Sequence, residues 1–274
     1  MRDKVVPMRE LHEEVAVQYE EVLNNVKLDQ ELGPELFEAK PSDIAIIGMA
    51  CFVPRGGDPQ TFWENILKKV NAFIEVPLER FDHRLYYDED RSARDKIYSK
   101  YGGYIDPIPF NPLDYGIPPT VIQSIDPMHF LALECAMRAL IDAGYGDMDF
   151  DRENTGVVLG ASGGVGDRGL QYAARCELPQ RLELITDEVL ERFPEWTEES
   201  FAGLLLNVIA GRVGNRLDLN GFNQTVDAAC ASSLAALNLA VHHLESRQGN
   251  MVIAGGVDTA MNPFGFTAFS KTQA

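Results

Sequence analysis

The chain has 274 residues, of which 45% are hydrophobic, and its formal net charge is −18. That length and apolar content suffice for one large buried core or two smaller ones. The acidic balance disfavours nucleic acid as a partner, because phosphate binding needs a basic surface. The N-terminus is charged, and the longest apolar run, residues 44–53, is too short to span a bilayer. We therefore expect a cytoplasmic protein without a membrane span.

Residues 1–40 differ from the rest of the chain. Apolar residues recur there at helical spacing, at Met8, Leu11, Val15, Tyr19, Val22 and Val26. Such a stripe predicts an amphipathic helix that either docks on the main domain or pairs with a second copy. We therefore expect an N-terminal helical extension over residues 1–40 and a main domain over residues 43–274.

The first half of the main domain mixes strand and helix patterns. Residues 43–50 predict a buried strand, and residues 62–70 predict a short helix. Residues 80–120 are rich in Pro, Gly, Tyr and Asp, which predicts a long irregular excursion over the surface. Residues 126–143 predict a helix, with an apolar face made by Phe130, Leu133, Met137, Leu140 and Ile141.

The second half continues the alternation. Strands are expected at residues 155–161, 224–226 and 251–257, and a core helix at residues 201–213. The acidic stretch at residues 177–200 predicts a surface helix and loop. Strand-like and helical runs that alternate in this way predict an α/β architecture.

Cys230 lies at a predicted corner between a strand and a helix. After it, apolar residues recur at helical spacing, at Leu234, Leu237, Val241 and Leu244. Free N–H groups and the dipole at the N-terminal end of a helix favour a thiolate over a thiol. The small residues on both sides leave room for a substrate carbonyl, which is the layout of an activated nucleophile. The alternative is a structural cysteine, because free cysteines are commonly buried.

The other three cysteines do not suggest a shared site. Cys51, Cys135 and Cys176 lie far apart, and no CxxC pair occurs. This spacing predicts neither a zinc site nor a disulfide framework. It agrees with a reducing compartment.

A glycine pattern follows the strand expected at residues 155–161. Gly164, Gly166 and Gly169 match G-x-G-x-x-G, the pattern of a dinucleotide-binding turn. Charged residues fill the x-x positions, however, and no strand is predicted where the acidic residue of that fingerprint should lie. We interpret the segment as a glycine loop near a pocket, and a nucleotide-binding oxidoreductase stays an alternative.

Three histidines are candidates for a base beside Cys230. His242 and His243 lie about three turns along the predicted helix, or about 20 Å from the cysteine at 1.5 Å per residue. That distance excludes both. His129 is not excluded by distance, although a structural role on the helix at residues 126–143 is the simpler interpretation.

Six segments together resemble the β-ketoacyl synthase (ketosynthase) domain of type I polyketide and fatty-acid synthases. In chain order they are Ile46–Pro54, Ile125-Asp126-Pro127 with Leu131–Gly144, Gly156–Gly160, Ala210–Leu217, Val226–Leu234 and Ala254–Val257. The resemblance covers residues 43–274. It implies the N-terminal half of a thiolase-like fold, a layered αβαβα arrangement that is normally a homodimer.

The resemblance also implies a chemistry. Cys230 corresponds to the nucleophile that accepts an acyl chain from phosphopantetheine, which an acyl carrier protein or domain holds. A malonyl-carrier thioester then loses CO2 and condenses with the acyl group. Phe269 corresponds to the family's aromatic residue next to the acyl pocket, although a lone aromatic is more often a core residue. No metal and no directly bound cofactor are implied.

Two departures from the family pattern stand out. The usual nucleophile motif is Asp-Thr-Ala-Cys-Ser-Ser-Ser, and Ala228 and Ala231 replace its Thr and its first Ser. The family's two catalytic histidines belong to motifs beyond residue 274. We therefore expect this chain to be an incomplete fragment that does not condense by itself. A non-catalytic thiolase-fold partner, similar to a chain-length factor, is the other alternative.

Overall fold

The protein is described by a computed structural model over residues 43–162 and 166–272. Its internal contacts separate residues 1–44 from residues 45–274, and the core and the site described below belong to the second unit. The helix expected within residues 1–40 lies outside the described residues. Where the chain is described, no helix is both long and apolar enough to cross a membrane.

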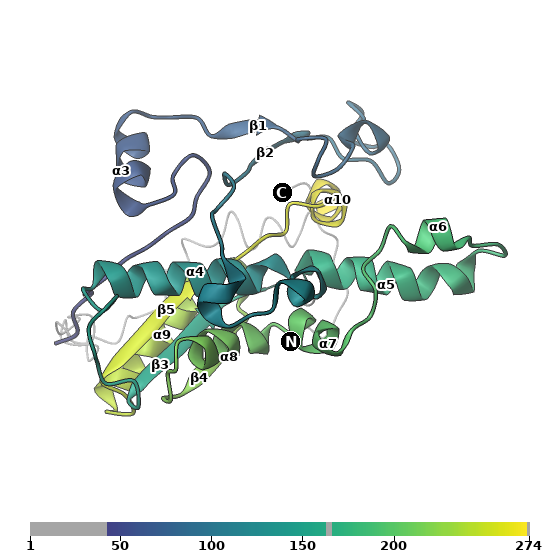
Figure 1. Ribbon diagram of the computed structural model, residues 1–274. Helices are drawn as coiled ribbons and strands as arrows, with labels where there is room; N and C mark the ends of the chain where they lie inside the picture. The colour runs from purple at the N-terminus through teal and green to yellow at the C-terminus, as the bar shows by residue number, and fades with distance from the viewer. Residues whose placement is uncertain (1–42, 163–165, 273–274) are drawn as a thin grey trace, which may run out of the picture. The chain divides into compact units, whose positions relative to one another are not determined.

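A parallel sheet of three strands forms the centre of this unit (Figure 1). Its order is β4 (Asn223–Val226), β3 (Thr155–Gly160), β5 (Met251–Gly256). Every residue of β3 is buried, as a central parallel strand with helices on both faces requires. The register pairs Gly160 with Val226 on one side and with Gly256 on the other. The three strands therefore end at one edge of the sheet, and the chain turns from there into the helices of the site.

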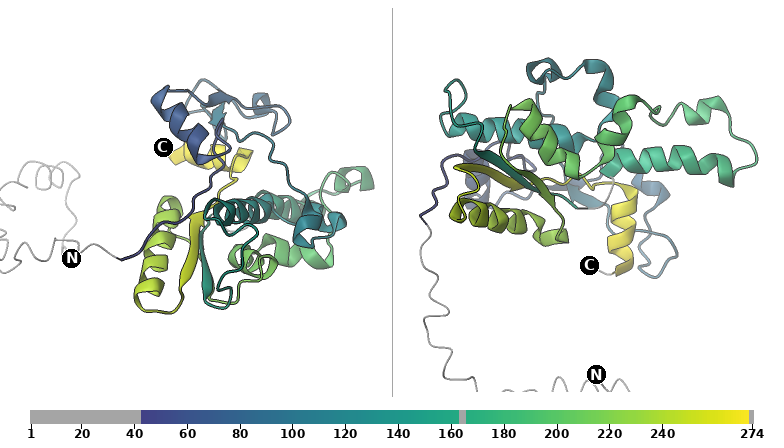
Figure 2. Two further views of the ribbon diagram at one scale, coloured as in Figure 1. Left: turned by 60° about the vertical axis from the view of Figure 1, so that its left-hand side comes forward. Right: turned by 90° about the horizontal axis from the view of Figure 1, so that it is seen from below.

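Helices cover both faces of the sheet (Figure 2). On one face, α9 (Ser232–Glu245) packs against β3 and β5. On the other face, α8 (Asn207–Arg216) packs against β3 and β4, and α4 (Pro127–Asp142) packs against α8. The expected α/β class and its helix-on-sheet layers are confirmed.

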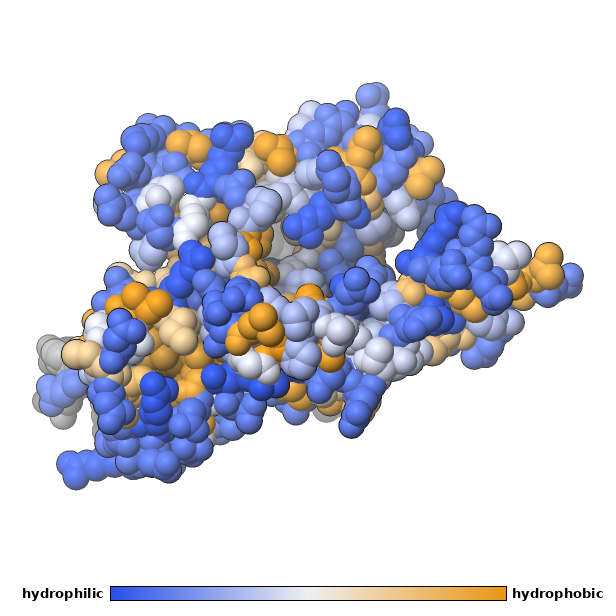
Figure 3. All heavy atoms as spheres, viewed as in Figure 1, coloured by the Kyte–Doolittle hydropathy of each residue, from blue (hydrophilic) through white to orange (hydrophobic). Residues whose placement is uncertain are grey.

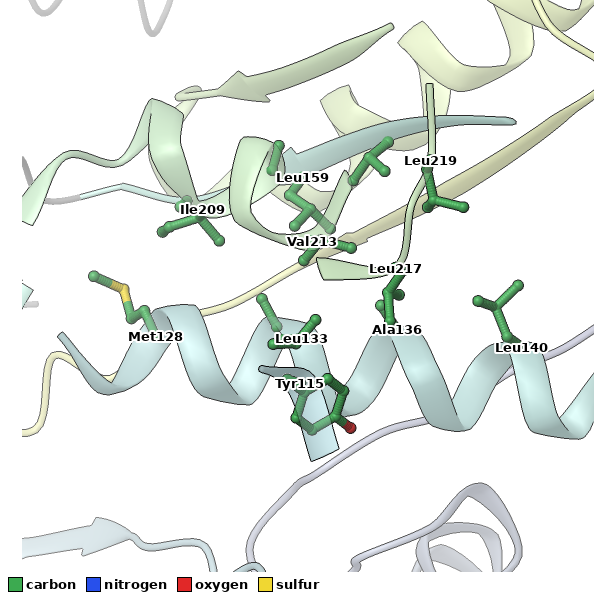
Figure 4. Close-up of a cluster of buried hydrophobic side chains, with 14 of the residues drawn as sticks. Tyr115, Met128, Leu133, Ala136, Leu140, Leu159, Ile209, Val213, Leu217 and Leu219 are labelled. Carbon is green, nitrogen blue, oxygen red and sulfur yellow. The ribbon is translucent and has the colours of Figure 1, made fainter. Parts of the chain in front are cut away.

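The main core lies between α4, α8 and the sheet. Figure 4 shows side chains of α4 pointing toward those of α8 and β3, with Leu133 opposite Val213 and close to Leu159. The helix begins where Asp126 caps it, since its carboxylate accepts the backbone N–H of Met128 at 3.0 Å. It ends before Gly144, whose φ of +85° favours glycine.

The inward face of α4 is shifted from the expected one. Leu133 and Leu140 are buried, and Phe130 and Met137 are half-buried against the core, but Ile141 is exposed. The fully buried positions also include three that the apolar stripe missed, Met128, Ala132 and Ala136. Small residues at a helix contact let the backbones approach, so the alanines make the centre of the α4–α8 contact.

The helix expected at residues 201–213 is wrong, because the structure has two helices there. They are α7 (Glu198–Leu204) and α8, and Leu205 between them has an extended backbone. The carbonyl of Gly203 accepts the backbone N–H of Asp126 at 3.0 Å, so the end of α7 is tied to the start of α4. Apolar spacing continues through the break because both helices bury one face.

The buried strand expected at residues 43–50 is also wrong. The segment belongs to no strand, and its apolar side chains are exposed, with Ile46 at 74%. The backbone N–H of Met49 instead donates to the Asp142 carboxylate at the end of α4, at 2.8 Å. An apolar run predicts a buried strand only where neighbouring elements cover it, and the described residues supply no such cover.

The helix expected at residues 62–70 and the irregular excursion at residues 80–120 are confirmed. The first is α3 (Pro59–Leu67). The second holds short 3-10 turns, η2 (His83–Leu85), η3 (Pro112–Tyr115) and η4 (Pro119–Ser124), and β2 (Tyr101–Gly103), which pairs with β1 (Phe73–Glu75). This part has its own small core of Val76, Phe81 and Ile97.

The remaining helices are α5 (Gly166–Arg181), α6 (Asp187–Leu190) and α10 (Pro263–Thr272). The end of α5 and all of α6 lie in the acidic stretch that was expected to be a surface helix and loop. Phe266 of α10 packs edge-on against Phe81 at 5.4 Å between ring centroids, which ties α10 to the small core. On the face shown in Figure 3, hydrophilic side chains predominate and hydrophobic ones occur in separate groups.

Candidate acyl-transfer site

Cys230 lies on the turn between β4 and α9, as the sequence predicts. The strand ends at Val226, a 3-10 turn spans Ala229–Ala231, and α9 begins at Ser232. The residue before the cysteine, Ala229, has a φ of +50°, in the left-handed region that residues other than glycine rarely adopt. Such strain persists only where the surroundings hold it, and it is concentrated at functional sites. The Cys230 side chain is exposed.

Hydrogen bonds hold this strained turn. The Ser232 hydroxyl accepts the backbone N–H of Ala228 at 2.9 Å and donates to the carbonyl of Ala229 at 2.7 Å. The Asp227 carboxylate accepts the backbone N–H of Ala229 at 2.9 Å. Ser232 is buried, and sequence reasoning considered it only as a small neighbour of the cysteine. The available signal was a serine at the first position of a helix, where hydroxyls often bond to the backbone.

Two glycines let α9 approach the sheet at this point. Gly160 ends β3, and a Cβ there would overlap the backbone of Ser232. Gly256 ends β5, and a Cβ there would lie 2.8 Å from the Cβ of Ser233. The two glycines are partners in the sheet register. Together they form a flat place on which the first turn of α9, and therefore Cys230, rests.

A pocket of about 480 Å³ opens beside Cys230. It is lined by the ends of β3 and β5 and by the first turns of α5, α9 and α10. Its walls are mostly apolar or small, and they include Ala161, Leu170, Val257, Phe264 and Ala268. Among the described lining residues the only charged ones are Asp167 and Asp258. Such a lining suits a neutral, apolar acyl chain.

Phe269, the second residue singled out in the sequence, lines the same pocket. It lies on α10 and is 60% exposed, so it faces the opening and not a core. The structure thus brings Cys230 and Phe269, which are 39 residues apart in the sequence, to one cavity. Both predicted site residues are therefore placed together.

The glycine segment contributes to the pocket as a loop. Gly164 lies outside the described residues, but Gly166 and Asp167 line the cavity at the start of α5. Residues 187–190, where the acidic residue of a dinucleotide fingerprint should follow a strand, are the helix α6. The interpretation as a glycine loop near a pocket is confirmed, and the dinucleotide interpretation lacks its second strand.

Asp126 fixes the start of α5, which sequence reasoning missed. Its second carboxylate oxygen accepts the backbone N–H of Arg168 at 2.9 Å, and a Cβ at Gly166 would overlap this carboxylate. Burial raises the pKa of Asp126, while the N–H groups of Met128 and Arg168 oppose that shift. One buried side chain thus joins the first turn of α4 to one wall of the pocket.

None of the described histidines lines the pocket. His129 is almost fully buried, and its Nδ1 accepts the Nε–H of Arg212 at 3.2 Å. Burial, assisted by the charge of Arg212, lowers the pKa of His129 to about 3, so the ring is neutral at physiological pH. His243 stacks on Phe222 with 3.8 Å between ring centroids. The structural role expected for His129 and the exclusion of the two distal histidines are confirmed.

The other cysteines are free and lie elsewhere. Cys51 and Cys135 are half-buried, and burial raises the pKa of Cys135 to about 11. Cys176 is exposed on α5 but does not line the pocket. Cys230 is therefore distinguished by the cavity beside it, and Cys176 offers an exposed thiol for comparison.

The chain matches a known family model and named relatives. Residues 41–274 match the model described as beta-ketoacyl synthase, N-terminal domain. A polyunsaturated fatty acid synthase component of Thraustochytrium sp. is 33% identical over 243 residues, which are 84% of this chain and 9% of that protein. The polyketide synthase PksN of Bacillus subtilis is 30% identical over 236 residues, which are 86% of this chain and 4% of that protein.

Solved ketosynthase structures share the fold. The oxazolomycin ketosynthase domain from Streptomyces albus has a TM-score of 0.68 and 28% identity, over 84% of this chain and 37% of that chain. The ketosynthase from module 6 of the bacillaene synthase of Bacillus subtilis has a TM-score of 0.65 and 26% identity, over 83% of this chain and 34% of that chain. The chain therefore has the layered thiolase-like fold that the sequence predicts, and it spans about a third of each solved chain. It belongs to the beta-ketoacyl synthase family and matches the N-terminal domain of that family.

Proposed function

We propose that Cys230 accepts an acyl group from a carrier thioester during chain elongation by a fatty-acid or polyketide synthase. One observation carries the proposal. An exposed thiol on a strained turn opens into a largely apolar pocket that four separate parts of the chain line. The family match and the ketosynthase relatives support the same activity.

The acyl transfer is a thiol–thioester exchange. The Cys230 sulfur, as a thiolate, attacks the carbonyl carbon of an acyl-phosphopantetheine thioester and forms a tetrahedral intermediate. The intermediate then breaks its bond to the carrier sulfur, and the departing thiolate takes up the proton that Cys230 released. Backbone N–H groups at the turn can stabilise the oxyanion. One C–S bond forms and one breaks, without oxidation or reduction.

Condensation completes the proposed reaction in the whole synthase. Decarboxylation of a malonyl-carrier thioester supplies a carbanion, which attacks the acyl group on Cys230 and releases CO2, a β-ketoacyl thioester and the free thiol. Since no described histidine lines the pocket, groups outside the described residues must handle charge in this step. An acyl carrier protein or domain is the proposed partner, a homodimer the proposed assembly, and the cytoplasm, where free cysteines persist, the proposed location.

Mass spectrometry of an acyl adduct tests this proposal. The full chain is incubated with an acyl-pantetheine thioester and digested, and the four cysteine-containing peptides are quantified. We expect an adduct on Cys230, little on Cys176, and none at position 230 in Cys230→Ala. The Cys176→Ser variant is the matched control, because it removes an exposed thiol that lies outside the pocket. No adduct on Cys230, or equal labelling of Cys230 and Cys176, would contradict the proposal.

A further inference from the structure

Two walls of the Cys230 pocket are joined by a hydrogen bond between side chains. One wall is the first turn of α5, which contributes Asp167 and Leu170, and the other is the start of α10, which contributes Asn262 and Phe264. The Asn262 side-chain N–H donates to the Asp167 carboxylate across 95 residues of sequence. We call this pair the wall bridge.

The orientation of Asn262 is fixed by a second contact. Its side-chain oxygen accepts the backbone N–H of Gly265 at 2.8 Å, in the first turn of α10. An amide side chain has one oxygen and one nitrogen, so the oxygen that caps α10 leaves the nitrogen to face Asp167. Asn262 therefore ends the loop after β5, begins α10 and contacts the opposite wall.

The wall that carries Asp167 is anchored separately. The buried Asp126 accepts the backbone N–H of Arg168 at 2.9 Å and the backbone N–H of Met128 at 3.0 Å. This carboxylate ties the first turn of α5 to α4. With one wall held by Asp126 and the other begun by Asn262, the wall bridge determines how far apart the two walls lie.

We propose that the wall bridge sets the width of the acyl pocket, so that Cys230 accepts straight-chain acyl groups in preference to acyl groups branched next to the carbonyl. The inference rests on the proposed acylation of Cys230 and adds a specificity-determining pair to it. A branch at that position broadens the acyl group close to the sulfur, where both walls line the cavity. One misplaced methyl group in a fitted pocket changes a rate by about 10- to 200-fold.

A cycle of variants tests the wall bridge. Butyryl- and isobutyryl-pantetheine are isomers, and the ratio of their Cys230 acylation rates measures the preference for a straight chain. In Asn262→Asp a carboxylate still caps Gly265 but faces Asp167 without a donor, so the bridge is lost. Asn262→Ser also keeps a cap acceptor and adds no charge. Asp167→Asn keeps an acceptor, and the double variant Asp167→Asn with Asn262→Asp restores the bond with donor and acceptor exchanged.

The expected result is a loss of preference that the exchange reverses. The wild-type chain should favour butyryl by about tenfold or more, and both Asn262 variants should reduce that ratio by about tenfold. Asp167→Asn and the double variant should keep or recover the wild-type ratio. Thermal unfolding of each variant checks that the ratio is measured on folded protein.

Two outcomes are distinguishable as failures. If wild-type Cys230 takes up neither acyl group, the proposed function itself is wrong. If wild-type Cys230 is acylated but the ratio stays unchanged in both Asn262 variants, or the double variant does not recover the ratio that Asn262→Asp loses, the wall bridge does not set specificity.

Discussion

Ser232 holds the turn that presents Cys230. Its hydroxyl bonds to a backbone N–H of Ala228 and to the carbonyl of Ala229, so it closes a small ring around the left-handed residue. Left-handed backbone at an alanine costs of the order of 1–3 kcal/mol and needs such support. The next residue, Ser233, is exposed and lines the pocket, which makes the two serines a matched pair.

We expect Ser232→Ala to slow the reaction of Cys230 and to destabilise the fold. Loss of the hydroxyl leaves the buried Ala228 N–H without its partner, which costs about 1–3 kcal/mol in the free energy of unfolding. Displacement of the sulfur by a fraction of an ångström should reduce its acylation rate by about tenfold to a hundredfold. Denaturant unfolding and acylation rates measure both effects, and Ser233→Ala should leave the free energy of unfolding within about 0.5 kcal/mol. Equal effects of the two substitutions would contradict this role.

His129 makes the stability of the core depend on pH. Its pKa is lowered to about 3 by burial and by the charge of Arg212, whose guanidinium lies 3.7 Å from the Glu199 carboxylate. The unfolded chain binds a proton on this histidine near pH 6.5, whereas the folded chain binds it only near pH 3. The neutral ring therefore contributes stability above pH 6.5, and that stability is lost as the pH falls from about 6.5 toward 3.

The variant His129→Gln separates this effect from the titration of carboxylates. Glutamine keeps an acceptor for Arg212 and does not titrate. Between pH 7 and pH 5 the wild-type chain should lose about 2 kcal/mol more of its unfolding free energy than the variant. Denaturant midpoints at the two pH values measure the difference. Parallel pH dependence of both proteins would show that His129 does not titrate as described.

At the scale of elements, the ends of β3 and β5 position the nucleophile helix. Gly160 and Gly256 lie side by side in the register and leave no side chain between the sheet and the first turn of α9. The neighbouring Gly255 differs, because a Cβ there would meet no atom within 4 Å. Two consecutive glycines on β5 thus provide one position that requires glycine and one that does not.

We expect Gly256→Ala to push α9 away from the sheet and Gly255→Ala to be tolerated. Overpacking at Gly256 should cost about 1–3 kcal/mol of unfolding free energy and slow Cys230 acylation. At Gly255 the same methyl group should change the free energy by about 0.5 kcal/mol or less. Thermal or denaturant unfolding of the two variants decides. Equal tolerance at both positions would mean that the helix does not rest on Gly256.

Most elements could be predicted because their own residues specify them. The capped start of α4, the all-buried β3 and the periodic α9 carry strong local patterns. The direction in which a helix faces could not be predicted in the same way. On α9 the leucines Leu234 and Leu237 are 70% and 46% exposed, whereas Ala236 and Ala240 face the sheet. Glycines at the strand ends favour the small face, and this is a property of packing that one helix does not contain.

At the scale of the whole molecule, the site is an intersection of distant segments. Cys230 and Phe269 could be predicted from the family resemblance, and their corner and helix from periodicity. The residues that hold the site, Ser232, Asp126 and Asn262, could not, because their roles depend on backbone partners up to 42 residues away and on a side chain 95 residues away. The error at residues 43–50 has the same origin, since burial of an apolar run depends on elements elsewhere.

The concentration dependence of acylation tests the central claim most directly. Rates of adduct formation on Cys230 and on Cys176 are measured in the same sample of full chain over a range of acyl-pantetheine concentrations. If the pocket binds the acyl group before transfer, the Cys230 rate should saturate and exceed that of Cys176, whose rate should rise linearly. Linear and equal rates at the two exposed thiols would contradict an acyl-transfer site at Cys230.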